Sequence, residues 1–153
     1  MEPKIVNKDK FYVVGVRYYG ANQHDEIGQL WQEFDQQRSR ITHGDQSIAY
    51  GLCFPVENEE DNEFEYVAGI QVPNLDSIPA GMVGRKIEAS RYAVFTHEGT
   101  LDKLLVTHRW IMNTYFPKSA YQPRKAPDFE YYDAKFKGKD NLESKLDLYY
   151  PIA

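Results

Sequence analysis

Apolar residues follow the same succession of patterns in both halves of the chain. In the first half, FYVVGVRYYG (11–20) is rich in Val and Tyr and ends in glycine, which predicts a strand followed by a turn. Residues 25–41 then place apolar side chains at the i, i+3, i+4, i+7 spacing of an amphipathic helix. SIAYGLCF (47–54) and FEYVAGIQV (64–72) predict two further strands. The first half is therefore expected to fold as strand, helix, strand, strand.

The second half repeats this order. RYAVFTHEG (91–99) predicts a strand, and the residues from about 100 to 116 keep the spacing of a helix. FEYYDAKF (129–136) and KLDLYYPI (145–152) predict two more strands. A repeat of this length indicates a duplicated module.

A shift of 80 residues superposes Tyr12 on Tyr92, and it also sets Tyr50 against Glu130. Each module predicts a small three-stranded antiparallel sheet with a helix on one face. The sequence therefore predicts an α+β fold of duplicated strand-helix-strand-strand modules with pseudo-twofold symmetry and helices on one face. The other face, along the junction between the modules, is expected to carry a ligand cleft, with Tyr50 opposite Glu130.

Glycine and proline in residues 73–84 predict a linker between the two modules. The halves are then about 1–75 and 85–153. A length of 153 residues suits one ordinary domain. We therefore expect 1–153 to form a single domain.

Composition and charge restrict the classes of partner. With 23 acidic and 18 basic side chains the net charge is -5, which argues against direct nucleic acid binding and favours a positively charged partner. Cys53 is the single cysteine, which excludes an internal disulfide and a cysteine-rich zinc site. The chain has no apolar signal sequence and no run of about 18 apolar residues. We expect a cytoplasmic protein with no cofactor, no metal and no membrane contact.

Two polar stretches invite functional interpretations that their spacing does not support. ENEEDNE (57–63) lacks the ligand spacing of a calcium loop, so it is interpreted as a solvated hairpin tip. His97 and Glu98 end a predicted strand, where such residues commonly lie in solvent. The four histidines show no metal-binding spacing.

Glu130 is the polar residue whose surroundings are hardest to explain. In PDFEYYDAKF (127–136) the alternation of a strand places Glu130 on the same face as Tyr132, Ala134 and Phe136. Taking a carboxylate out of water costs several kcal/mol unless a positive group meets it. Two interpretations stay open: an exposed carboxylate on an edge strand, or a desolvated anion that binds a cation.

Four passages together resemble a known family. They are YAVFTHEGTLDKL (92–104), WIMNTYFPKSAYQP (110–123), PDFEYY (127–132) and LDLYYPI (146–152). In this order and spacing the chain resembles the GyrI-like or AraC-type effector-binding domain, as a stand-alone member. The resemblance implies a pseudo-symmetric pair of modules that bind small hydrophobic molecules, often cations.

The resemblance also implies site residues. It assigns the acid of the Phe-Glu-x-Tyr strand to Glu130, with Tyr132 on the same strand face, Tyr149 as a ring on the last strand and Trp110 as an aromatic of the second helix. Tyr50 is added to these ligand-binding residues by the 80-residue shift. No catalytic residue is expected.

Three functions remain. The leading hypothesis is a drug- or effector-binding module for lipophilic cations, linked to transcription regulation or to drug sequestration. The first alternative is a small hydrolase of reactive compounds that uses Glu130. The second is a protein-binding module that modulates gyrase, since some relatives in the resembled family are similar to gyrase-binding proteins.

Overall fold

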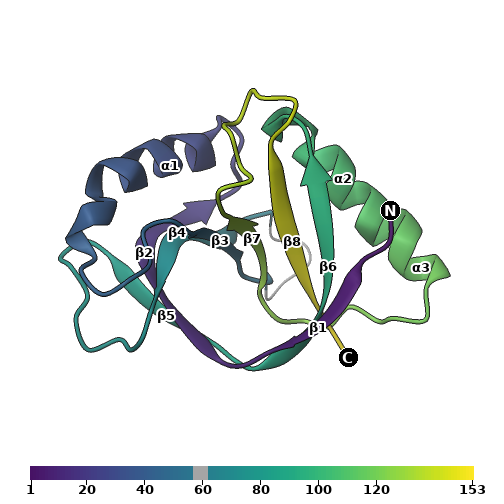
Figure 1. The fold of residues 1–153 in the computed structure, drawn as a ribbon, viewed down its shortest axis with the longest axis horizontal. Helices are drawn as coiled ribbons and strands as arrows, with labels where there is room; N and C mark the ends of the chain where they lie inside the picture. The colour runs from purple at the N-terminus through teal and green to yellow at the C-terminus, as the bar shows by residue number, and fades with distance from the viewer. Residues whose placement is uncertain (57–61) are drawn as a thin grey trace.

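The computed structural model describes residues 1–56 and 62–153 (Figure 1). The strands are β1 (Lys4–Lys8), β2 (Phe11–Gly20), β3 (Ala49–Cys53), β4 (Phe64–Val72), β5 (Val83–Ile87), β6 (Ser90–Glu98), β7 (Asp128–Tyr132) and β8 (Lys145–Ile152). The helical segments are α1 (Glu26–Gln37), the 3-10 turns η1 (Arg38–Arg40) and η2 (Leu101–Lys103), α2 (Leu104–Trp110), the π-helical turn η3 (Ile111–Tyr115) and α3 (Phe116–Lys118). Most of the hairpin tip expected at 57–63 lies outside the described residues.

Within the described residues, the strands form one antiparallel sheet with the order β1-β6-β8-β7-β3-β4-β2-β5. Each strand of the first half has a counterpart in the second half: β1 with β5, β2 with β6, β3 with β7 and β4 with β8. Exchanging every strand for its counterpart reverses the order onto itself, so a pseudo-twofold axis passes between β3 and β7. The α+β fold with duplicated modules and pseudo-twofold symmetry is thereby confirmed.

β1 and β5 are strands that the hydrophobic pattern does not predict. Their sequences, KIVNK and VGRKI, are short and half polar, which is typical of edge strands that keep one side in water. β5 begins inside 73–84, the passage expected to be a linker. With these two strands, the two expected three-stranded sheets become one continuous eight-stranded sheet.

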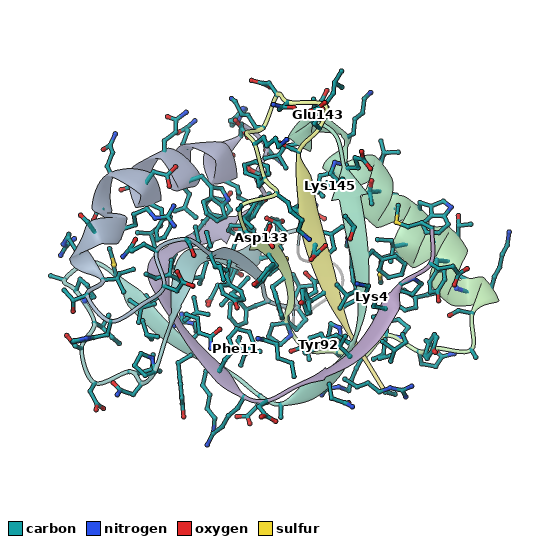
Figure 2. All side chains as sticks on the ribbon, viewed as in Figure 1. Lys4, Phe11, Tyr92, Asp133, Glu143 and Lys145 are labelled. Atoms are coloured by element: carbon teal, nitrogen blue, oxygen red, sulfur yellow. The ribbon has the colours of Figure 1, made fainter. Side chains whose placement is uncertain are left out.

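The sheet curls so that its two edges approach each other. Two residues separate β1, at one edge, from β2, which lies next to the other edge, and two residues separate β5 from β6. A core cluster with members from both halves fills the helix-free face: Phe11, Val13, Tyr50, Leu52, Val67, Ile87, Tyr92 and Phe129. Figure 2 shows side chains crowding the space above the curved strands, with Phe11 and Tyr92 labelled near its lower edge. The middle of this face is core, so the cleft expected along it is not found there among the described residues.

The helices cover the two ends of the other face, with β7 and β8 in view between them (Figure 1). α1 buries Leu30 and Phe34 in a cluster with residues of β2 and β4. On the other side, Ile111 and Phe116 pack in a cluster with residues of β6 and β8. The helix expected at about 100–116 is confirmed, with a π-helical turn inside it. No helix among the described residues is long and apolar enough to cross a membrane.

Candidate functional site

Glu130 on β7 accepts two hydrogen bonds through one of its carboxylate oxygens. The Tyr66 hydroxyl donates to Oε1 at 2.7 Å, and the Tyr132 hydroxyl donates to the same atom at 2.8 Å. No described residue donates to Oε2. Every completely enclosed side-chain oxygen among the described residues has a hydrogen-bond partner, so Oε2 is not completely enclosed. Glu130 is accordingly half-buried, with one oxygen held and the other available.

The arrangement depends on a glycine in the neighbouring strand. Gly51 on β3 pairs with Glu130 on one side and with Ala68 of β4 on the other. A Cβ atom at Gly51 would lie 2.1 Å from the Tyr66 hydroxyl oxygen and 2.6 Å from Oε1 of Glu130. Tyr66 can therefore reach across β3 to the carboxylate because residue 51 has no side chain.

Substituting Gly51→Ala is expected to lower the free energy of unfolding by about 1 to 3 kcal/mol, the usual cost of forcing an extra carbon into a packed site. The methyl group would displace the buried Tyr66 ring and break its hydrogen bond to Glu130. Urea unfolding measures the change. Gly28→Ala on α1 is the matched control, because its Cβ would meet the side-chain carboxylate of the exposed Asp25, which can move away. An unchanged midpoint for Gly51→Ala would contradict the tight fit.

Aromatic rings from both halves surround the carboxylate. The Trp31 indole N–H, from α1, donates to the Tyr66 hydroxyl at 3.0 Å, and the Trp31 ring lies 5.2 Å from the Tyr132 ring, edge to face. Tyr132 also contacts the Phe136 ring at 4.8 Å. Tyr132 packs against both the α1 cluster and the α2 cluster, so the Glu130 site lies between the two helices. Trp31, Tyr132 and Phe136 are all half-buried residues.

Burial raises the pKa of Glu130 above its ordinary value, and the hydrogen bonds from Tyr66 and Tyr132 offset this only in part. Asp128 lies two residues earlier on the same strand. Burial, and secondarily the charge of Glu130, raises the pKa of Asp128 to about 7. No basic side chain contributes to either shift. The site is therefore anionic and lacks a positive partner of its own among the described residues.

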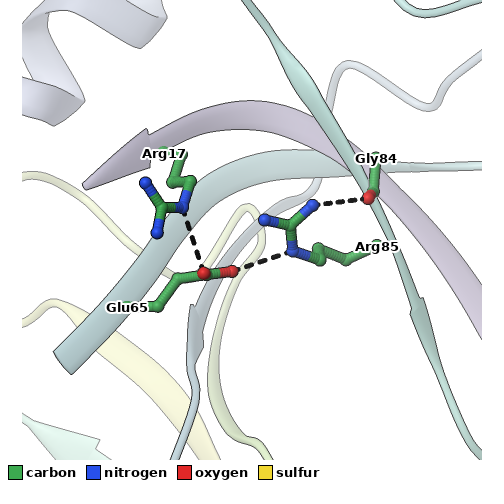
Figure 3. A network of polar contacts seen from close by, with 4 residues as sticks. All are labelled: Arg17, Glu65, Gly84 and Arg85. Atoms are coloured by element: carbon green, nitrogen blue, oxygen red, sulfur yellow. Dashed lines mark hydrogen bonds and ion pairs between the residues drawn. The ribbon is translucent and has the colours of Figure 1, made fainter. Parts of the chain in front are cut away.

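Glu65 shows what a partnered carboxylate looks like in the same protein (Figure 3). Arg85 donates through Nε to Oε1 of Glu65 at 2.8 Å, and Arg17 donates through Nε to Oε2 at 3.0 Å. Burial acts to raise the pKa of Glu65, but the two guanidinium groups outweigh it and lower the pKa. Glu130 differs because its partners are phenols, which carry no positive charge.

The structure brings one of the expected ring residues, Tyr132, into direct contact with Glu130. Trp110 lies on α2 with its ring 5.9 Å from the Tyr115 ring, on the same face of the sheet as Glu130. No described contact joins Trp110 to Glu130.

Tyr50 and Tyr149 project from the opposite face of the sheet. Tyr50 pairs with Tyr131, one residue away from the expected position opposite Glu130, and it packs in the core of the helix-free face. Tyr149 stacks on Phe129 at 4.5 Å on that same face. Because neighbouring residues of a strand point to opposite sides, neither ring can share a ligand with the Glu130 carboxylate. The prediction that Tyr50 and Tyr149 lie on the same face as Glu130 is therefore wrong.

Four residues of the site were not anticipated: Trp31, Gly51, Tyr66 and Asp128. The strand alternation that places Glu130 on one face also places Asp128 on that face, two residues earlier. Asp128 could therefore have been predicted from the sequence. Trp31 has the spacing of an ordinary core residue of an amphipathic helix. No local sequence feature predicts the contact between Gly51 and Tyr66, since this contact depends on the register of three strands.

A hollow of about 850 Å³ lies elsewhere, at the end of the curled sheet where β3 ends and β4 begins. It is lined by Tyr19, Phe54, Pro55, Val56, Glu63, Phe64, Glu65, Lys86, Ile87, Glu88, Tyr92, Arg124, Lys125, Ala126 and Pro127. Its charged groups are of both signs, and Lys86 already pairs with Glu88 at 3.3 Å. Glu130 does not line it, so this hollow is separate from the anionic site.

Comparison with known proteins identifies relatives over the full length. The model of the Cass2 family, integron-associated effector binding proteins, matches residues 4–152. The transcriptional regulator BrlR of Pseudomonas aeruginosa is 37% identical over 153 residues, which are 99% of this chain. The chain spans 56% of that regulator's length.

Solved structures share the fold. The structure of SAV2435 bound to tetraphenylphosphonium has a TM-score of 0.74 and 21% identity, over 100% of this chain and 94% of that one. The integron cassette protein VCH_CASS2 of Vibrio cholerae has a TM-score of 0.70 and 18% identity, over 99% and 96% of the two chains. The resemblance to GyrI-like effector-binding domains is confirmed. The chain belongs to the Cass2 family of integron-associated effector binding proteins, within the GyrI-like superfamily.

Proposed function

We propose that this effector-binding protein takes lipophilic cations and that Glu130 is the group that meets their positive charge. The observation that carries the proposal is a desolvated carboxylate with one accessible oxygen and no basic partner among the described residues. Such a group costs free energy in the empty protein, and an incoming cation removes that cost.

The rings beside Glu130 supply the second part of the recognition. The faces of Trp31 and Tyr132 offer apolar area and can attract a cation, at about 0.5 to 2 kcal/mol for each contact. Tyr66 and Tyr132 hold Oε1, so the carboxylate does not need to reorganise when a ligand arrives. This combination selects for charge and flat apolar shape, and it tolerates many outlines.

Two relatives support this function. SAV2435, which has the same fold, is bound to the lipophilic cation tetraphenylphosphonium in its structure. BrlR is a transcriptional regulator, and the matching part is 56% of its length. We infer that ligand binding by this chain serves transcription regulation. In a regulator such as BrlR, any contact with DNA would be made by the part that this chain does not match.

We propose binding without turnover. The matching family is described by effector binding, which does not favour the hydrolase alternative. The gyrase-modulating alternative stays a prediction. In this proposal Glu130 acts as a fixed anion and transfers no proton to a substrate.

The proposal is tested with two ions of matched shape and opposite charge. We expect tetraphenylphosphonium to bind at least about 100-fold more tightly than tetraphenylborate, because the anion would meet an unpaired carboxylate in a desolvated site. Quenching of tryptophan fluorescence measures both affinities, since Trp31 borders the site. Equal affinities would mean that apolar area alone drives binding, and the charge role of Glu130 would be wrong.

A further inference from the structure

Asp128 places a second carboxyl group on the face that carries Glu130. The two residues are separated by one position in β7, so their side chains project to the same side with Cα atoms about 7 Å apart. In the neighbouring strand Asp128 pairs with Cys53, as Glu130 pairs with Gly51. Both partners across the ladder are small, and the Tyr66 hydroxyl fills the space above Gly51.

The carboxyl group of Asp128 has no partner among the described residues. Across residues 1–56 and 62–153, no side chain forms a hydrogen bond or an ion pair with its carboxyl group. Every completely enclosed side-chain oxygen in that part of the chain has a hydrogen-bond partner. Because the Asp128 oxygens have none, they are not completely enclosed. Asp128 is half-buried, like Glu130. It is therefore a second carboxyl group of the site, partly desolvated and without a hydrogen-bond or ion-pair partner among the described residues.

The ionisable groups that face Asp128 and Glu130 cannot neutralise them. Cys53 from β3, Tyr66 from β4, Tyr132 from β7 and Tyr150 from β8 are all acids, and burial raises the pKa of each, so all four stay uncharged.

The helices packed on this face add no positive charge either. From α1, Trp31 presents a neutral indole. From α2, His108 bonds the Tyr150 hydroxyl at 2.7 Å, and burial lowers the pKa of His108, which favours its neutral form. No positively charged group among the described residues contributes to the pKa of Asp128.

Two carboxyl groups this close oppose each other's ionisation, so the empty site keeps a proton up to neutral pH. One bound positive charge satisfies one carboxylate. Two bound positive charges favour ionisation of both carboxyl groups at a lower pH than in the empty site. The ligand that best fits the carboxyl groups of Asp128 and Glu130 therefore carries two cationic centres.

Building on the function proposed above, we propose that Asp128 is a second anionic contact of the site and that its preferred ligands are lipophilic dications whose positive centres match the spacing of Asp128 and Glu130. A monocation would use Glu130 alone. Asp128 is then the residue that sets the preference between ligands of single and double charge.

A matched pair of probes tests this. 1,1′-Dimethyl-4,4′-bipyridinium is a dication, and 1-methyl-4-phenylpyridinium is a monocation with the same two-ring frame. The dication is more strongly hydrated, so it gains over the monocation only where a second anion meets it. By calorimetry at pH 7 we expect the dication to bind about tenfold more tightly, the factor of one ion pair of moderate strength. We also expect it to release more protons, which titrations in buffers of different ionisation enthalpy measure.

The variants separate this inference from the proposed function. Asp128→Asn should remove the preference for the dication and change the affinity of the monocation by less than about threefold. Glu130→Gln should weaken both probes. Asp140→Asn, on the exposed surface, removes the same charge and should leave the preference intact. If Glu130→Gln weakens both probes while Asp128→Asn keeps the parent's preference, the function stands and the role of Asp128 is overturned. If the parent binds neither probe nor tetraphenylphosphonium, both proposals fall.

Discussion

Replacing Glu130 with glutamine is expected to weaken tetraphenylphosphonium binding by about 30- to 100-fold, equivalent to about 2 to 3 kcal/mol of binding free energy. Glutamine has nearly the same volume, and its amide oxygen can still accept hydrogen bonds from Tyr66 and Tyr132. The substitution thus removes the charge and keeps the shape. The loss is large because the carboxylate and the cation meet in a desolvated environment, where their attraction is weakly screened.

Glu33→Gln is the matched control for this experiment. Glu33 lies on the exposed side of α1, and its substitution removes the same unit charge from a solvated position. We expect it to change the affinity by less than about twofold. Thermal unfolding of the empty Glu130→Gln protein should show no loss of stability, since the variant buries no charge. If Glu130→Gln binds tetraphenylphosphonium as tightly as the parent, ring contacts carry the affinity and the charge pairing is wrong.

Much of the fold could be predicted from the sequence because its strands have strong local patterns. The strands expected at 11–20, 64–72 and 145–152 coincide with β2, β4 and β8, where β-branched and aromatic residues dominate. β1 and β5 were not predicted, because an edge strand buries only one side and these two carry lysine and arginine. Their pairing partners also lie about 80 residues away, or beyond a whole module, which no local pattern encodes.

The site divides in the same way between local and long-range information. Alternation within one strand was enough to place Glu130 and Tyr132 together, because it needs no partner strand. The position of Tyr50 depended on the register between β3 and β7, and an error of one residue moved it to the opposite face. Only the fold shows that Gly51, and no ring, faces Glu130, and that the gap it leaves is filled by Tyr66 from a third strand.

Asp128→Asn is expected to change how the stability of the empty protein depends on pH. The pKa of Asp128 is raised from 3.8 to about 7 by burial and by Glu130. Between these two values the folded protein holds a proton that the unfolded chain has released, so the free energy of unfolding falls as pH rises and levels off above about pH 7. The difference corresponds to about 2 to 4 kcal/mol, allowing for the partial exposure of the side chain. Asparagine cannot ionise and should remove most of this loss.

The two proteins should therefore have similar stability near pH 4, and the variant should be the more stable one at pH 8. Urea unfolding at a series of pH values measures the difference, and Asp140→Asn, in the exposed loop before β8, should follow the parent throughout. Glu130 contributes in the same direction, since its pKa is also raised by burial, so a shallower fall should persist in Asp128→Asn. A variant whose stability falls as steeply as that of the parent would show that Asp128 is solvated in the empty protein, and the second anion of the site would then carry no energetic penalty for a dication to relieve.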